Sequence, residues 1–126
     1  MSFEESTWVR SLLDDGADAH ADPYQLIYSL HNEDPEAPID ELYRRATGLV
    51  RAVLRDGLMS MVEVTYRNAS DDERVLVAER LLSADEAEEK IDDPWIWDRA
   101  NTDCDTFFAL STTEKGMAFL DSSGTA

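Results

Sequence analysis

The chain has a single cysteine, Cys104, so no disulfide can form within it, which agrees with a reducing compartment. It also has only two histidines, and the sequence has no glycine-rich phosphate loop, no His-Glu-x-x-His pattern and no serine elbow. We therefore expect no enzymatic activity and no cofactor. No apolar run approaches the ~20 residues of a membrane span. The first five residues lack the basic and apolar segments of a signal peptide, which predicts a cytoplasmic location.

Acidic residues are abundant. The 126 residues contain 28 Asp and Glu against 11 Lys and Arg, a formal net charge of -17. Such a field repels nucleic acid and anionic membranes and attracts cationic proteins. The same composition also fits a host whose proteins carry acidic surfaces, and both interpretations stay open.

The charge is unevenly distributed along the chain. Residues 1–36 hold nine acids against one arginine, and residues 68–98 hold eleven acids against three basic residues. Residues 37–67, between these two blocks, hold four acids against five arginines. Length and composition predict one globular domain over residues 1–120 with a flexible tail over residues 121–126.

Apolar spacing predicts three helices at the start of the chain. The first covers residues 3–14, with a Ser2-x-x-Glu5 capping box and Gly16 as its stop. The second covers residues 23–31, with Asp22 as its cap and proline at its first position. The third covers residues 39–56, and its apolar stripe comprises Ile39, Leu42, Tyr43, Ala46, Leu49, Val50, Val53 and Leu54.

The period then changes to two, which predicts a strand over residues 58–67. Residues 75–78 are assigned to a returning strand, although so short a run also fits the start of a helix. Ser83-x-x-Glu86 is a capping box that opens a helix over residues 84–92. A strand over residues 106–110 and a last helix opened by Ser111-x-x-Glu114 complete an α+β order.

Two segments carry a family resemblance. The third helix ends in Arg55-Asp56-Gly57-Leu58, and the late strand runs into Leu110-Ser111-Thr112-Thr113-Glu114-Lys115-Gly116. This combination resembles the winged helix-turn-helix family, with Ser111 at the place of the usual threonine. The resemblance implies three N-terminal helices, a small antiparallel sheet and a C-terminal helix. Residues 68–105 depart from the family because they form an extended, helix-containing wing.

A narrower resemblance rests on Leu82-Ser83-x-x-Glu86-Ala87, Asp92-Asp93-Pro94, Trp97 and Thr113-Glu114-Lys115-Gly116. These stretches are similar to small acidic bacterial proteins that confer immunity to secreted toxins. The resemblance implies a non-enzymatic protein that occludes the surface of a basic toxin domain.

The stretch that precedes the late strand combines dense carboxylates with two tryptophans. Tryptophan is over-represented among residues that dominate binding energy, and a carboxylate field speeds encounter with a cationic partner. Alternatively, the tryptophans fill the core and the acids only hydrate a short helix. The candidate partner-binding residues are Asp85, Glu88, Glu89, Asp92, Asp93, Trp95 and Trp97.

Four arginines of the third helix give an alternative function. Arg44, Arg51 and Arg55 share one helical face, opposite the apolar stripe, and Arg45 lies beside it. Guanidinium groups bind phosphates and guanine edges, so this face predicts a dimeric DNA-binding regulator. The competing interpretation is a solvated face with helical ion pairs.

Two further patterns have simpler explanations. Asp18, His20 and Asp22 lack the glycine and terminal glutamate of an EF-hand loop, and Asp22 is explained as a helix cap, so we expect no metal site. A homodimer that uses Met59, Met61 and the tryptophans is a third possible assembly.

Overall fold

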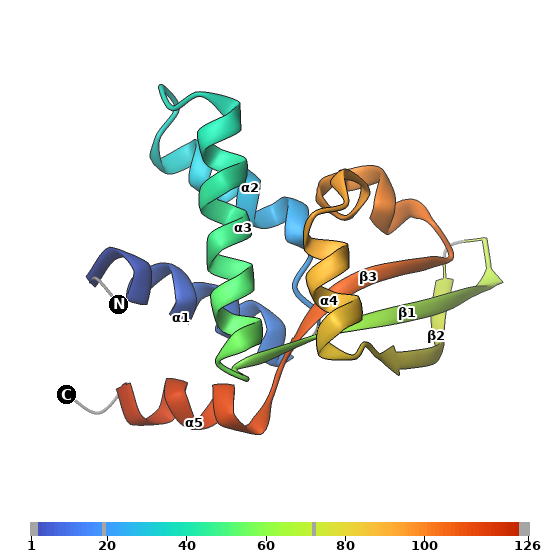
Figure 1. Cartoon of the computed structure of the whole chain (residues 1–126). Helices are drawn as coiled ribbons and strands as arrows, with labels where there is room; N and C mark the ends of the chain where they lie inside the picture. Colours follow the sequence, from blue (N-terminus) through green and yellow to red (C-terminus); the bar gives the residue numbers. More distant parts are fainter. Residues whose placement is uncertain (1–2, 19, 72, 124–126) are drawn as a thin grey trace.

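The computed structural model describes residues 3–18, 20–71 and 73–123 (Figure 1). Three helices come first, α1 (Phe3–Asp18), α2 (Pro23–Glu33) and α3 (Ile39–Arg55). They form a layer on one side of an antiparallel sheet, and a last helix, α5 (Glu114–Ser123), lies beneath them in this view. The expected α+β class, with three N-terminal helices and a C-terminal helix, is confirmed.

The sheet has three strands, β1 (Met59–Ser70), β2 (Glu73–Leu81) and β3 (Thr106–Thr112), in the order β2-β1-β3. The central strand β1 is antiparallel to both neighbours. Residues 75–78 lie within β2, so the strand assignment is confirmed. Between β2 and β3 the chain forms α4 (Ala84–Ile91) and two 3-10 turns, η1 (Pro94–Trp97) and η2 (Arg99–Asp103).

The middle of α3 supplies much of the core. Leu42, Ala46, Val50 and Val53 recur at intervals of three or four residues and are at most 1% exposed. Ile39 and Tyr43 were expected on this stripe, but they are 58% and 38% exposed. Their turn lies at the end of the helical layer away from the sheet, so less of the molecule covers it (Figure 1).

Helix α1 does not end at the expected glycine. It continues through Gly16 to Asp18, and Gly16 is the point where α1 meets the sheet. A β-carbon there would collide with the Met59 and Thr112 side chains, and the Thr112 hydroxyl donates to the Leu13 carbonyl at 2.7 Å. The glycine serves close approach, not termination. The expected cap at Ser2 lies outside the described residues.

The ends of the other helices agree only in part with the prediction. Pro23 begins α2, but the Asp22 side chain makes no capping hydrogen bond. The capping box of Ser83 and Glu86 is confirmed at the start of α4. Ser111 does not cap α5, because β3 extends through Thr112; the Gly116 N–H instead donates to the Thr113 hydroxyl at 3.1 Å. Helix α5 includes residues 121–123, which were expected in the tail.

The alternating residues of β1 are buried on both faces of the sheet. Met59 and Met61 join the main core with Leu13 and Leu110. Val62 and Val64 pack with Phe107 and Ala109 in a second cluster. The two methionines are at most 2% exposed, so they cannot form the homodimer surface that was considered for them. None of the described helices combines the length and apolarity of a membrane span.

Candidate functional site

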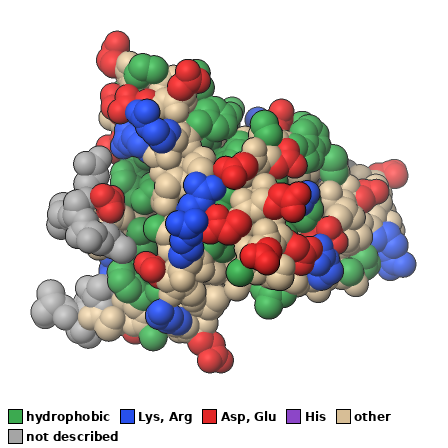
Figure 2. Space-filling model, in the orientation of Figure 1, with side chains coloured by type: hydrophobic (Ala, Val, Ile, Leu, Met, Phe, Trp, Pro, Cys, Tyr) green, Lys and Arg blue, Asp and Glu red, His purple; other side chains and the backbone are tan. Residues whose placement is uncertain are grey.

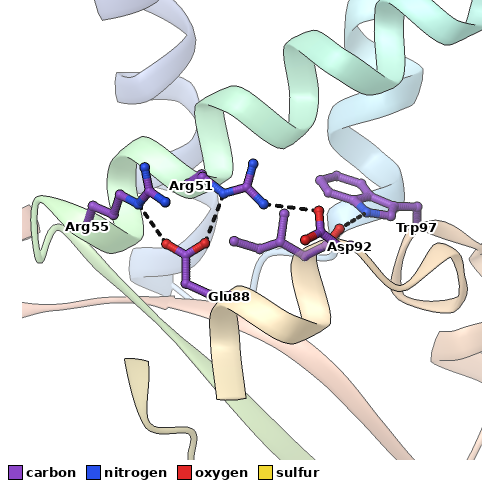
Figure 3. Close-up of polar contacts among 6 residues, drawn as sticks. Arg51, Arg55, Glu88, Asp92 and Trp97 are labelled. Carbon is purple, nitrogen blue, oxygen red and sulfur yellow. Dashed lines mark hydrogen bonds and ion pairs between the residues drawn. The ribbon is translucent and has the colours of Figure 1, made fainter. Parts of the chain in front are cut away.

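The arginine face of α3 and the acidic helix α4 face each other (Figure 3). Arg51 and Arg55 are one helical turn apart, as are Glu88 and Asp92, so the two pairs align across the helix contact. Glu88 accepts from Arg51 Nε at 2.9 Å and from Arg55 Nε at 2.7 Å. Asp92 accepts from Arg51 Nη2 at 3.0 Å. Residues from the two separate candidate sites therefore form one internal network.

The protonation behaviour of this network follows from its hydrogen bonds. The Arg55 and Arg51 guanidinium groups lower the pKa of Glu88 below its usual value. The same contacts, from Glu88 first and Asp92 second, raise the pKa of Arg51. Both groups stay charged in the ordinary pH range, so the network holds α4 against α3 without further ligands.

Two other acids of this region have local structural roles. Glu86 accepts from the Ser83 N–H in the capping box and lies 3.0 Å from Arg80, contacts that lower its pKa. Asp93 accepts from the Trp95 N–H at 3.0 Å at the start of η1. These carboxylates organise the chain around α4.

The two tryptophans differ in burial. Trp97 is only 5% exposed, and its indole N–H donates to the Ile91 carbonyl at 3.0 Å. Its ring also meets Tyr43 of α3 edge to face, with centroids 6.3 Å apart. Trp97 is therefore a core residue and is not accessible to a partner. Trp95 is 44% exposed.

The accessible part of the predicted site is smaller than the sequence indicated. We use the name α4–η1 surface for its accessible members. Figure 2 shows acidic side chains gathered where α4 lies in Figure 1, beside basic side chains of α3. The α4–η1 surface comprises the exposed residues Asp85, Glu89, Asp92 and Trp95 and the partly buried Asp93.

The remaining two arginines lie elsewhere. Arg44 and Arg45 line an open groove of about 1070 Å³ between α1, α2 and α3, together with Trp8 and Gly48. Arg45 lies 3.7 Å from Asp34. This groove was not predicted from the sequence. Gly48 is the sequence feature that could have indicated the groove, because it leaves open space on an otherwise bulky helix.

Comparison with known proteins identifies no relative. No family model matches the chain, and no curated protein or solved structure is significantly similar to it.

The segment considered for metal binding has other contacts. His20 Nε2 lies 3.5 Å from Glu79 of β2. Burial raises the pKa of Asp22, and the nearby His20 partly opposes that effect. Across residues 3–18, 20–71 and 73–123 no group of three or more acidic, histidine or cysteine side chains is placed to hold a metal ion.

Proposed function

We propose that this chain is a non-enzymatic protein-binding domain whose α4–η1 surface docks a basic protein. The single observation that carries the proposal is the exposure of Trp95 within a carboxylate-rich segment. An exposed indole costs solvation free energy in a free monomer and supplies a large contact in a complex.

The charge around Trp95 favours a cationic partner. Within the described residues, Asp85 and Glu89 make no ion pair, and the Asp92 side chain is 72% exposed despite its bond to Arg51. The net charge of -17 extends the same field over the molecule. Complementary fields of this kind raise the rate of encounter.

The internal ion pairs weaken the case for a DNA-binding regulator. Arg51 and Arg55 donate to Glu88 and Asp92, so phosphate would have to displace carboxylates of the same chain. Arg45 lies near Asp34, and Arg44 is the remaining member of the predicted face. Phosphate contacts contribute most of the affinity for DNA, so pairing these arginines internally reduces that affinity.

The finer assignment is a winged-helix-like immunity protein that occludes a toxin domain. Its support is the order of three helices and a strand, with β3 returning antiparallel to β1. Ala21, between α1 and α2, also bridges Leu110 through two backbone hydrogen bonds of 2.8 and 2.9 Å, which places a short extended segment beside β3. In this proposal, residues 68–105 are an insertion that carries the binding surface.

The test uses the chain as bait in an extract of its native host, followed by mass spectrometry. We expect a basic protein to be retained by the wild-type chain and lost with the triple variant Asp85→Asn, Glu89→Gln, Trp95→Ala. A matched control, Glu33→Gln with Glu36→Gln, removes two charges at exposed sites away from α4 and should retain the partner.

The salt dependence of association and the binding of DNA are two measurements that could contradict this proposal. Because exposed charges are screened over ~8 Å at physiological ionic strength, association with the purified partner should slow as salt increases. Equal association rates for the triple variant and the control would reject the α4–η1 surface. Retention of DNA fragments in a gel shift by the wild-type chain, together with no bound protein, would support the regulator instead.

A further inference from the structure

The outer strand β2 exposes large apolar side chains at an open sheet edge. Leu76, Val77 and Leu81 are between 42% and 65% exposed. Strand β2 pairs only with β1, and in the described part of the chain no strand covers its other edge. Such an edge presents unpaired backbone donors and acceptors, which favour the addition of another strand.

The charges along β2 are self-complementary. When the strand is aligned antiparallel with a second copy of itself, acidic residues lie opposite basic ones. The strand reads Glu73-Arg74-Val75-Leu76-Val77-Ala78-Glu79-Arg80. If a second copy lies antiparallel about an axis between Leu76 and Val77, each charge meets its opposite. The cross-strand pairs are Glu73 with Arg80, Arg74 with Glu79, Val75 with Ala78, and Leu76 with Val77.

Residues paired across two strands must lie on the same face of the sheet. In a regular strand Arg74 and Glu79 would point to opposite faces, because their positions differ by an odd number. The register of β2 against β1 shifts, however: Ala78 lies opposite Thr65 and Leu76 opposite Tyr66, which leaves Val77 as an extra residue.

Because of this bulge, Arg74 and Glu79 lie on the same face of the sheet. Arg74, Leu76 and Glu79 lie opposite Asn68, Tyr66 and Val64, which alternate along β1 and so share one face. Val75, Ala78 and Arg80 lie opposite Arg67, Thr65 and Glu63 on the other face. The Arg74–Glu79 pair of the reversed register is therefore brought to one face, whereas Glu73 lies opposite Ser70, beyond a second irregularity between Asn68 and Ser70.

We propose that β2 is a homodimer interface, at which two copies of this chain join antiparallel and extend the sheet across both molecules. Charges on an edge strand commonly prevent such pairing because like charges meet. Here the reversed order places opposite charges across from each other, which favours a second copy of this chain at the edge. This proposal is independent of the proposed function.

The charged residues of β2 have contacts within the chain that a second copy would have to share or displace. Arg80 lies 3.0 Å from Glu86 and 3.5 Å from Glu63, so the Glu73–Arg80 pairs are expected to contribute less than the Arg74–Glu79 pairs. Arg74 donates to the carbonyls of Thr102 and Cys104 and lies over the Tyr66 ring, which uses two of its five donors. The Glu79 side chain is 42% exposed, although it lies 3.5 Å from His20. Glu79 therefore remains accessible, whereas the Arg74 guanidinium has to turn away from Tyr66 to meet Glu79 of a second copy.

The experiment is sedimentation velocity at micromolar to submillimolar concentrations, because a short strand interface is expected to be weak. We expect a monomer–dimer equilibrium for the wild-type chain. Arg74→Glu and Glu79→Arg should each weaken self-association by about tenfold, because each creates two like-charge pairs. The double variant, and an equimolar mixture of the two single variants, should regain the wild-type affinity.

Substitutions at exposed apolar residues test the interface without changing a charge pair. Val77→Lys should be monomeric, whereas the control Ile39→Lys, at an exposed residue of α3, should dimerise as the wild type does. Circular dichroism checks that each variant is folded. A wild-type chain that stays monomeric throughout, a dimer that survives Val77→Lys, or a mixture that fails to regain affinity would each overturn the proposal.

Discussion

Glu88 joins two features that the sequence treats separately. It was a candidate contact for a basic partner, and Arg51 and Arg55 were candidate contacts for DNA. In the folded chain each oxygen of Glu88 accepts from one of these arginines (Figure 3). A carboxylate held by two guanidinium groups is expected to stabilise the docking of α4 and to contribute little to binding a partner.

We predict that Glu88→Gln lowers the melting temperature by a few degrees at pH 7. The pKa of Glu88 is lower in the folded chain than in the unfolded chain, so its contribution is complete above the unfolded pKa and is lost as pH falls through the folded pKa. The difference between variant and wild type should therefore shrink as pH falls. Thermal unfolding followed by circular dichroism at several pH values measures it.

Glu89→Gln is the matched control for this prediction. Glu89 is the next residue of α4, is exposed, and has no ion pair in the described part of the chain, so its variant should melt close to the wild type. Equal melting temperatures for both variants at pH 7 would show that the network does not stabilise the fold.

Individual residues also explain why the site could be predicted only in part. The sequence identified every member of the α3–α4 network by residue type. It did not indicate that the two groups face each other, because 37 residues separate Arg51 from Glu88. Trp95 and Trp97 are equally apolar, and their different burial depends on the contacts of Ile91 and Tyr43 with Trp97.

Among the elements, prediction was most successful where the local pattern decides the structure. The middle of the α3 stripe, the alternation of β1 and the capping box of α4 each follow from nearby residues, and each is present in the structure. Helix ends were less predictable. Gly16 is of a residue type that commonly ends a helix, but here it lets α1 lie close to Met59 and Thr112, which are distant in the sequence.

Gly48 and Gly116 should respond in opposite ways to substitution by alanine, because their surroundings differ. Gly48 lies in the middle of α3, and a β-carbon there would meet nothing within 4 Å. Gly48→Ala should therefore stabilise the protein by about 0.5–1 kcal/mol, the usual cost of glycine in a helix relative to alanine. Gly116→Ala should destabilise it by ~1–3 kcal/mol, because the new methyl group would collide with the Leu58 carbonyl oxygen.

Urea unfolding of the two alanine variants measures both effects, with an unchanged slope as the check that the unfolded state is the same. The free energy of unfolding should rise for Gly48→Ala and fall for Gly116→Ala. If Gly48→Ala were destabilising, the groove beside Gly48 would need to be narrower than the structure shows.

At the scale of the whole molecule, two electrostatic effects oppose each other. A net charge of -17 repels itself in the compact state and lowers its stability. Contact pairs such as Arg51 with Glu88 and Arg80 with Glu86, 2.9 and 3.0 Å apart, attract. Salt screens long-range repulsion more completely than pairs in direct contact, since the Debye length is ~8 Å at physiological ionic strength.

We therefore predict that the melting temperature at pH 7 rises as sodium chloride is increased from low to physiological concentration. The control uses the same protein and salts near the isoelectric point of about 4.2, where net repulsion is small and the rise should vanish. Differential scanning calorimetry measures both series. A fall in melting temperature at pH 7 would mean that the attractive pairs outweigh the self-repulsion, and the acidic surface would then stabilise this fold through its pairing with the arginines of α3 and β2.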